Sequence, residues 1–146
     1  MKNLLSDAIL QKVANGAAAG QGTTTSDEVD TAGVDSVAFL VSIGAITATG
    51  TVTVHAEQDV VTGMGGAADL AGSAQAYTDA DSNKLLILEI HRPMERFVHC
   101  VCVRAVANAV LNGIYAIKSM AKNRPVAQGA TVVASKILLS PAEGTP

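Results

Sequence analysis

The stretch from residue 36 to residue 58, SVAFLVSIGAITATGTVTVHAEQ, decides the fold class of this chain. In its first half, Val37, Phe39, Val41 and Ile43 recur at every second position. A period of two places alternate side chains on opposite faces of an extended backbone. The segment therefore predicts a strand with one face of large apolar side chains.

The second half of the stretch repeats this pattern after a turn. Residues 44–50 begin and end with glycine, and Val52, Val54 and Ala56 then occupy alternate positions. The opposite face of this second segment carries the polar side chains of Thr51, Thr53, His55 and Glu57. Two alternating segments joined by a short glycine-bounded turn predict a β-hairpin.

The rest of the chain adds short apolar segments separated by glycine, proline and asparagine. Strands are expected at Ser73–Tyr77, Lys84–Arg92, Arg96–Ala105 and Val110–Met120, and Ala130–Leu139 is either a last strand or a second arm. Six to eight short strands without a central helix predict an all-β fold. We expect a single β-sandwich or jelly roll spanning residues 29–139.

The two ends differ from this central domain. Leu5, Ile9 and Val13 recur every four residues, which permits a short amphipathic helix. The residues from 16 to 26 are small and flexible and offer no side chain to anchor them. We therefore interpret residues 1–28 as an extended N-terminal arm and residues 140–146 as a C-terminal tail.

The composition is apolar, and most of the hydrophobic side chains are small. Of 146 residues, 49% are hydrophobic, but only 3% are aromatic and 16% are charged. A poorly charged, apolar surface favours self-association. The sequence contains no run of 18 apolar residues, so we expect no membrane span. The net charge of −3 argues against a general nucleic-acid binder.

The charges are unevenly distributed along the chain. Residues 1–82 hold two basic and ten acidic side chains, whereas residues 83–146 hold eight basic and three acidic ones. The main basic group consists of Arg92, Arg96, Arg104, Lys118, Lys122 and Arg124. Three interpretations remain open: solvated strand ends, ion pairs with an acidic neighbour in this or another chain, and contacts to nucleic acid.

The run His99-Cys100-Val101-Cys102 is the strongest candidate for metal chemistry. On a strand the two thiols share one face and His99 points to the other, so only two zinc ligands converge. Two small thiols in a core strand are the favoured interpretation. The sequence has no Gly-x-Ser-x-Gly motif. We predict no enzymatic activity, no metal, no cofactor and no small-molecule substrate.

Several segments resemble small virion proteins of tailed bacteriophages. These are DTAGVDSVAFLV at 30–41, GTVTV at 50–54, RPMERFV at 92–98, ANA at 107–109 and IYAIK at 114–118, followed by Pro125. Taken in this order, the segments resemble the hairpin and closing strands of jelly-roll head decoration (cement) proteins, as in Bordetella phage and similar podoviruses. The acidic continuation usual after Asp59 is replaced here by VVTGM at 60–64.

The resemblance implies a structural virion protein made in the host cytoplasm and carried on the outer surface of the capsid. It implies that the protein binds an HK97-type head and clamps neighbouring major capsid proteins. Its expected partners are the major capsid protein and itself, with a dimer favoured over a trimer. Neither nucleic acid nor a membrane is expected as a partner.

Two sets of residues are predicted to contact those partners. The arm anchors are Leu4, Leu5, Ile9 and Val13, and the capsid-facing charges are Arg92, Arg96 and Arg124. The alternative function is another phage structural protein, or a receptor- or carbohydrate-binding β-sandwich module. The scarcity of aromatic side chains disfavours a sugar-binding module, because sugars bind on stacking platforms.

Overall fold

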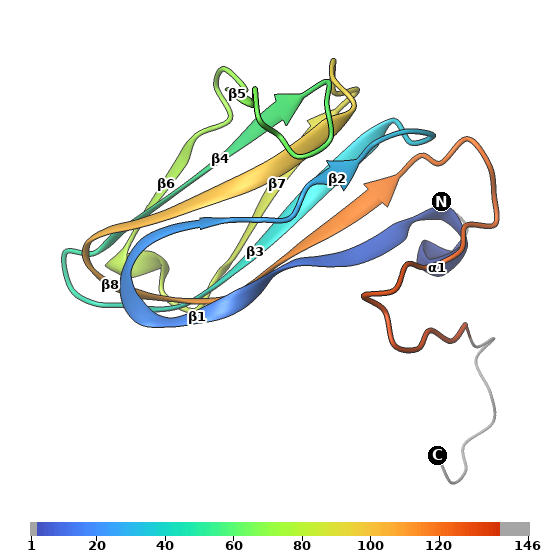
Figure 1. The fold of residues 1–146 in the computed structure, drawn as a ribbon. Helices are drawn as coiled ribbons and strands as arrows, with labels where there is room; N and C mark the ends of the chain where they lie inside the picture. Colours follow the sequence, from blue (N-terminus) through green and yellow to red (C-terminus); the bar gives the residue numbers. More distant parts are fainter. Residues whose placement is uncertain (1–2, 138–146) are drawn as a thin grey trace, which may run out of the picture.

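A computed structural model describes residues 3–137 of the chain (Figure 1). The described residues form one antiparallel sheet with a four-residue helix, α1 (Leu4–Asp7), and one 3-10 turn, η1 (Asp79–Asp81). The strands are β1 (Ile9–Thr25), β2 (Val29–Asp30), β3 (Ser36–Ile46), β4 (Thr51–Asp59), β5 (Ala68–Asp69), β6 (Gln75–Thr78), β7 (Leu85–His91) and β8 (Phe97–Ser119). The prediction of an all-β fold is confirmed.

The long strand β8 lies at the centre of the sheet. Its first half pairs with β4, where Thr51 lies opposite Ala105, and its second half pairs with β3, where Ile46 lies opposite Ala109. On its other edge β8 pairs with β1 and β2. The sequence predicted two separate strands here; the structure has one strand that continues through a bend near Val106, which has a positive φ of 67°.

The curl of the sheet encloses a single core (Figure 1). The predicted hairpin is wrong, because β3 and β4 pair with different halves of β8 and not with each other. The inward faces predicted for the two segments are confirmed, because all seven of their apolar side chains are buried. Both halves of β8 add buried side chains to the same cluster, among them Val98, Cys100, Cys102, Leu111 and Ile114. Residues far apart along β8 therefore pack together only because the strand bends.

The N-terminal segment differs from the expected flexible arm. Helix is limited to α1, and residues 9–25 form β1, which runs along β8 for most of its length. A Cβ atom at Gly16 would lie 2.8 Å from the backbone oxygen of Asn112, so the two strands approach closely there. At Gly16, the first of the residues interpreted as flexible, the absence of a side chain therefore lets β1 pack against β8.

The C-terminal segment forms no strand in the part that the structure describes. Residues 130–137 are irregular, so the prediction of a strand at Ala130–Leu139 is wrong over that range. Instead, Gln128 and Thr131 accept hydrogen bonds from the backbone amides of Leu10 (2.9 Å) and Lys12 (3.2 Å). The segment thus covers the free edge of β1. The predicted tail, residues 140–146, lies outside the described residues.

Arg104 holds the bend of the sheet from inside. Its side chain is buried, and its Nη1 donates hydrogen bonds to the carbonyl oxygens of Ala18 (2.9 Å) and Ala109 (2.8 Å). These carbonyls lie where β1 and β8 lose their regular pairing, between Ala17 and Gly22 on β1. Backbone groups freed at a bend need other partners when they are buried. Arg104 supplies them.

We expect Arg104→Ala to lower the free energy of unfolding by about 2–4 kcal/mol, because two carbonyls lose hydrogen bonds from a charged donor. Urea denaturation followed by circular dichroism measures the change. Lys136→Ala, at an exposed position in the C-terminal segment, is the matched control, with an expected change within about 0.5 kcal/mol. Equal stability of the two variants would show that Arg104 does not hold the bend.

Candidate functional site

The outer face of β1, β8, β3 and β7 is apolar, and we call it the apolar sheet face. It consists of Leu10, Leu40, Leu85, Ile87, Tyr115 and Ile117. Leu85, Ile87 and Tyr115 remain 53%, 56% and 41% exposed. Leu40 lies opposite Tyr115 on one side and Ile87 on the other, so the row is continuous across three strands. Continuous exposed apolar surface marks a site of protein contact.

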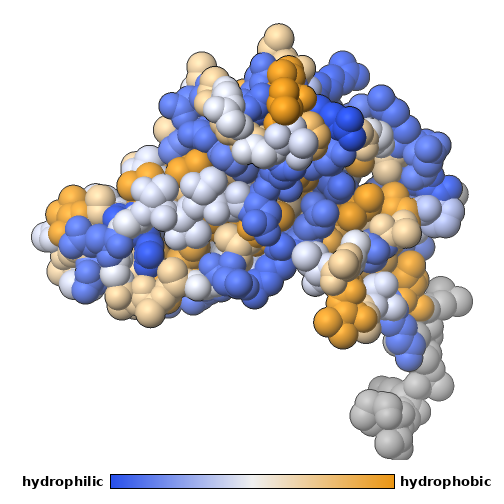
Figure 2. Space-filling model, viewed as in Figure 1, coloured by the Kyte–Doolittle hydropathy of each residue, from blue (hydrophilic) through white to orange (hydrophobic). Residues whose placement is uncertain are grey.

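The C-terminal segment borders this face and forms a groove beside it. The groove has a volume of about 370 Å³ and is lined mainly by Leu10, Leu40, Tyr115, Ile117 and Val132. Figure 2 shows hydrophobic side chains gathered around the C-terminal segment at the right of the view. A shallow apolar groove at the border of an apolar sheet suits a protein partner better than a small polar molecule.

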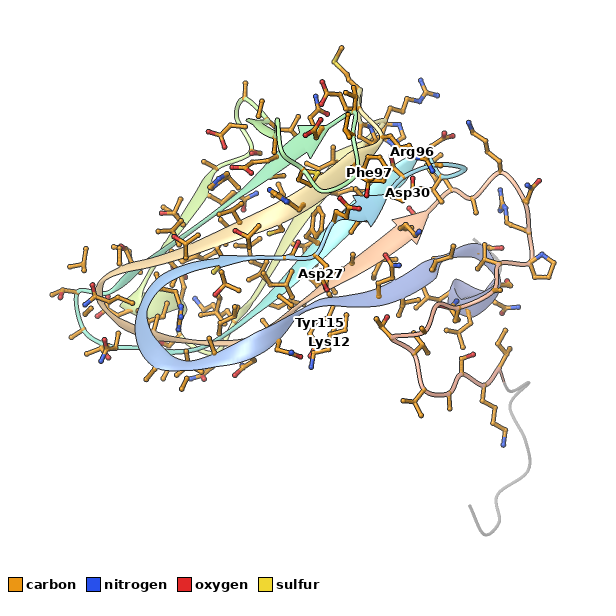
Figure 3. The ribbon with its side chains drawn as sticks, viewed as in Figure 1. Lys12, Asp27, Asp30, Arg96, Phe97 and Tyr115 are labelled. Carbon is orange, nitrogen blue, oxygen red and sulfur yellow. The ribbon has the colours of Figure 1, made fainter. Side chains whose placement is uncertain are left out.

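The apolar sheet face has opposite charges at its two edges. Lys12 on β1 lies opposite Tyr115 in the sheet, and both are labelled in Figure 3. Glu89 on β7 lies opposite Ala38 of β3 and accepts a hydrogen bond from the Ser36 hydroxyl. The face therefore carries a positive edge and a negative edge on either side of an apolar centre.

Two of the predicted capsid-facing arginines lie together at one end of the sheet. Arg92 and Arg96 line a hollow of about 600 Å³ with Lys122, and Asp35 and Glu95 also contribute to it. Arg92 is exposed, and its positive φ of 52° places it in the turn after β7. The third arginine, Arg124, lies elsewhere, 3.8 Å from the carboxylate of Asp7.

Arg96 has a structural contact within the chain. Its Nε and Nη2 donate to the two carboxylate oxygens of Asp30, at 2.9 and 2.8 Å, and its guanidinium lies 5.1 Å from the ring centre of Phe97 (Figure 3). The hydrogen bonds from Arg96 lower the pKa of Asp30 to about 2. This bidentate pair joins β2 to the start of β8, so Arg92 is the freer of the two charges in the hollow.

The predicted arm anchors are in different environments. Leu4 is exposed and Leu5 and Ile9 are partly exposed, whereas Val13 is buried within the core of this chain. Val13 therefore has no exposed surface for a partner, and its prediction as an anchor is corrected. The core needs it because β1 belongs to the sheet.

The uneven charge distribution is explained in part by pairing within the chain. Asp30 with Arg96 and Asp7 with Arg124 each join the acidic first part to the basic second part. Lys118 also donates to the backbone oxygen of Asp30 (3.2 Å). Of the three interpretations of the basic group, ion pairing within the chain is the one seen for Arg96 and Arg124.

The thiols of Cys100 and Cys102 are part of the core, as predicted. Burial raises the pKa of Cys100 to about 12 and that of Cys102 to about 11, so both remain protonated near neutral pH. On the opposite face, His99 contacts Glu57, and His55 lies near Glu57 and Asp69. This grouping was missed from the sequence, where only the outward alternation of His55 and Glu57 was visible.

No known protein family matches the sequence, and no curated protein is similar to it. Among residues 3–137, no helix is long and apolar enough to cross a membrane.

We expect Asp30→Asn to lower the free energy of unfolding by about 0.5–1 kcal/mol at pH 7, since the pair is partly exposed and screened by solvent. The pKa of Asp30 is depressed in the folded state, so its stabilisation is complete above about pH 4 and is lost as pH falls toward 2. Thermal unfolding at pH 7 and pH 2 measures this. Asp27→Asn is the control. A difference in unfolding free energy between the wild type and Asp30→Asn that is as large at pH 2 as at pH 7 would contradict the expectation.

Proposed function

We propose that the chain is a structural, non-enzymatic virion protein: a decoration (cement) protein that binds the outside of an HK97-type phage head. In this role it clamps neighbouring major capsid proteins and stabilises the shell. The apolar sheet face is the observation that carries the proposal, because an exposed apolar surface of this extent suits assembly. The resemblance of its segments at 30–54 and 92–118, in the same order, to phage decoration proteins supports the same function.

The proposal includes the finer fold, a β-sandwich of jelly-roll type. Its support is the way in which the two halves of β8, with β3 and β4 beside them, contribute side chains to one core. Sheets that pack face to face in this way give a rigid body with two outer faces. A rigid body of this kind is suited to bearing load between capsid subunits.

For self-association, we propose a dimer formed through the apolar sheet face. A two-fold axis parallel to the strands would place β1 of one copy over β7 of the other. Lys12 of each copy would then approach Glu89 of its partner, while Leu40, Ile87 and Tyr115 would form the apolar centre. An interface that repeats the same patch on both copies requires this kind of self-complementary charge.

For the capsid contact, we propose the end of the molecule that holds Arg92 together with the exposed part of the N-terminal segment. Arg92 is exposed at the rim of the hollow, and Leu4 is exposed in α1. Charges at the rim of an interface mainly set its orientation and rate of association. Many copies on a symmetric shell would then add their individually weak contacts.

The dimer proposal predicts that Ile87→Asp yields a monomer, because a carboxylate would be buried in the apolar centre of the interface. Light scattering coupled to size-exclusion chromatography measures the mass of each variant. Val106→Asp is the matched control: Val106 is exposed at the bend of β8, away from the apolar sheet face, and we expect that variant to stay dimeric. A wild-type monomer at high concentration would refute the dimer.

The capsid proposal predicts that the purified chain cosediments with empty capsid shells of the phage that encodes it. Leu4→Asp and Arg92→Glu should each weaken this binding by about tenfold or more, because every copy on the shell loses the contact. We use point variants because deletion of residues 1–28 would remove β1 from the sheet. Lys136→Glu is the control. Absence of wild-type cosedimentation would overturn the decoration function.

A further inference from the structure

The polar outer face of β4, β5 and β8 gathers four side chains, His55, Glu57, Asp69 and His99, which we call the histidine–carboxylate cluster. His55 and Glu57 are two residues apart on β4 and share its outer face. Glu57 lies opposite His99 on β8 and opposite Asp69 on β5. Three neighbouring strands therefore bring residues separated by more than 40 positions to one point of the surface.

The distances within the cluster match those between ligands of one metal ion. The Nε2 atom of His55 lies 3.2 Å from Oδ1 of Asp69 and 3.5 Å from Oε1 of Glu57, and one ligand atom from each of the three lies within 4.8 Å of the others. Zinc binds nitrogen and oxygen at about 2.0–2.2 Å, so ligand atoms in a tetrahedral site are roughly 3.3–3.5 Å apart. We propose that His55, Glu57 and Asp69 bind a divalent transition-metal ion, with zinc as the best fit.

His99 would act as a partner of a ligand. Its Nε2 contacts Oε2 of Glu57 at 2.5 Å, while Oε1 of the same carboxylate faces His55. Buried groups behind a metal ligand fix its orientation and keep it in its charged form. The contact with His99 also lowers the pKa of Glu57.

The donor set indicates which class of ion would bind. One imidazole nitrogen and two carboxylate oxygens favour zinc, cobalt, nickel or manganese over soft ions such as copper(I). The site opens to solvent, because the side chain of Asp69 is 74% exposed and that of His55 is 21% exposed. Three protein ligands leave the fourth position of a tetrahedral ion for water.

The expected consequence of binding is structural. Asp69 lies on β5, a strand of two residues that pairs only with β4 in the described sheet. An ion shared by β4 and β5 would hold the loop between β4 and β6 against the sheet. Binding that occurs only in the folded state raises the melting temperature. The proposed metal site does not depend on whether the chain decorates a capsid.

The experiment uses the untagged full-length chain at pH 7.5. Isothermal titration with Zn²⁺ should show one site per chain, and Co²⁺ should give a visible absorption band from a low-symmetry site. His55→Ala and Asp69→Asn should each weaken Zn²⁺ affinity by about tenfold or more, and His99→Gln should also weaken it because Glu57 loses its orienting partner. Asp69→Asn changes an exposed side chain, so its loss of binding would not reflect unfolding.

His91→Ala is the matched control, since His91 is an exposed histidine on β7, outside the cluster. We expect it to bind Zn²⁺ as the wild type does and to show the same rise in melting temperature. Affinity should also fall as the pH is lowered, because protons compete with the metal ion for its ligands. No Zn²⁺ or Co²⁺ binding by the wild type, or unchanged binding by Asp69→Asn and His55→Ala, would overturn the proposal. In that case the contacts of His55 with the carboxylates of Glu57 and Asp69 would by themselves account for the cluster.

Discussion

The backbone hydrogen bonding of β8 is the constraint on which the rest of this structure depends. The other long strands of the described sheet, β1, β3 and β4, all pair with it. Because β8 bends, strands paired to its two halves are brought around one core. The buried guanidinium of Arg104 satisfies carbonyl groups at that bend, so a charged side chain inside the curl replaces ladder bonds that curvature removes.

The bend also separates two outer faces of different chemistry. The face over β1, β8, β3 and β7 presents Leu40, Ile87 and Tyr115, whereas the face over β4 and β5 presents His55 and Glu57. An apolar face suits contact with another protein, and a polar face with converging ligands suits an ion. The two proposals therefore place assembly on one side of the curled sheet and metal-dependent reinforcement of a loop on the other.

The edge of β1 accounts for the position of the segment that contains Gln128 and Thr131. An exposed strand edge offers unpaired backbone groups to other chains. Here Gln128 and Thr131 cover part of the edge of β1 through their side chains, so that edge is closed to uncontrolled pairing. The proposed association would then use the faces of the sheet, where side-chain chemistry selects the partner.

The sequence by itself determined the all-β class and the inward residues of β3 and β4, because alternation along a strand is a local property. It did not determine how these strands pair: β3 and β4 each pair with β8 and not with each other as a hairpin. It also placed Cys100 and Cys102 in the core. Only the tertiary structure decided that the N-terminal glycine- and alanine-rich stretch is a strand, since close approach to β8 and flexibility favour the same small residues. The grouping of His55, Glu57, Asp69 and His99, and the pairing of Asp30 with Arg96, depend on strand register. Because the paired strands are distant in the sequence, the pattern within each strand does not show which residues lie opposite one another.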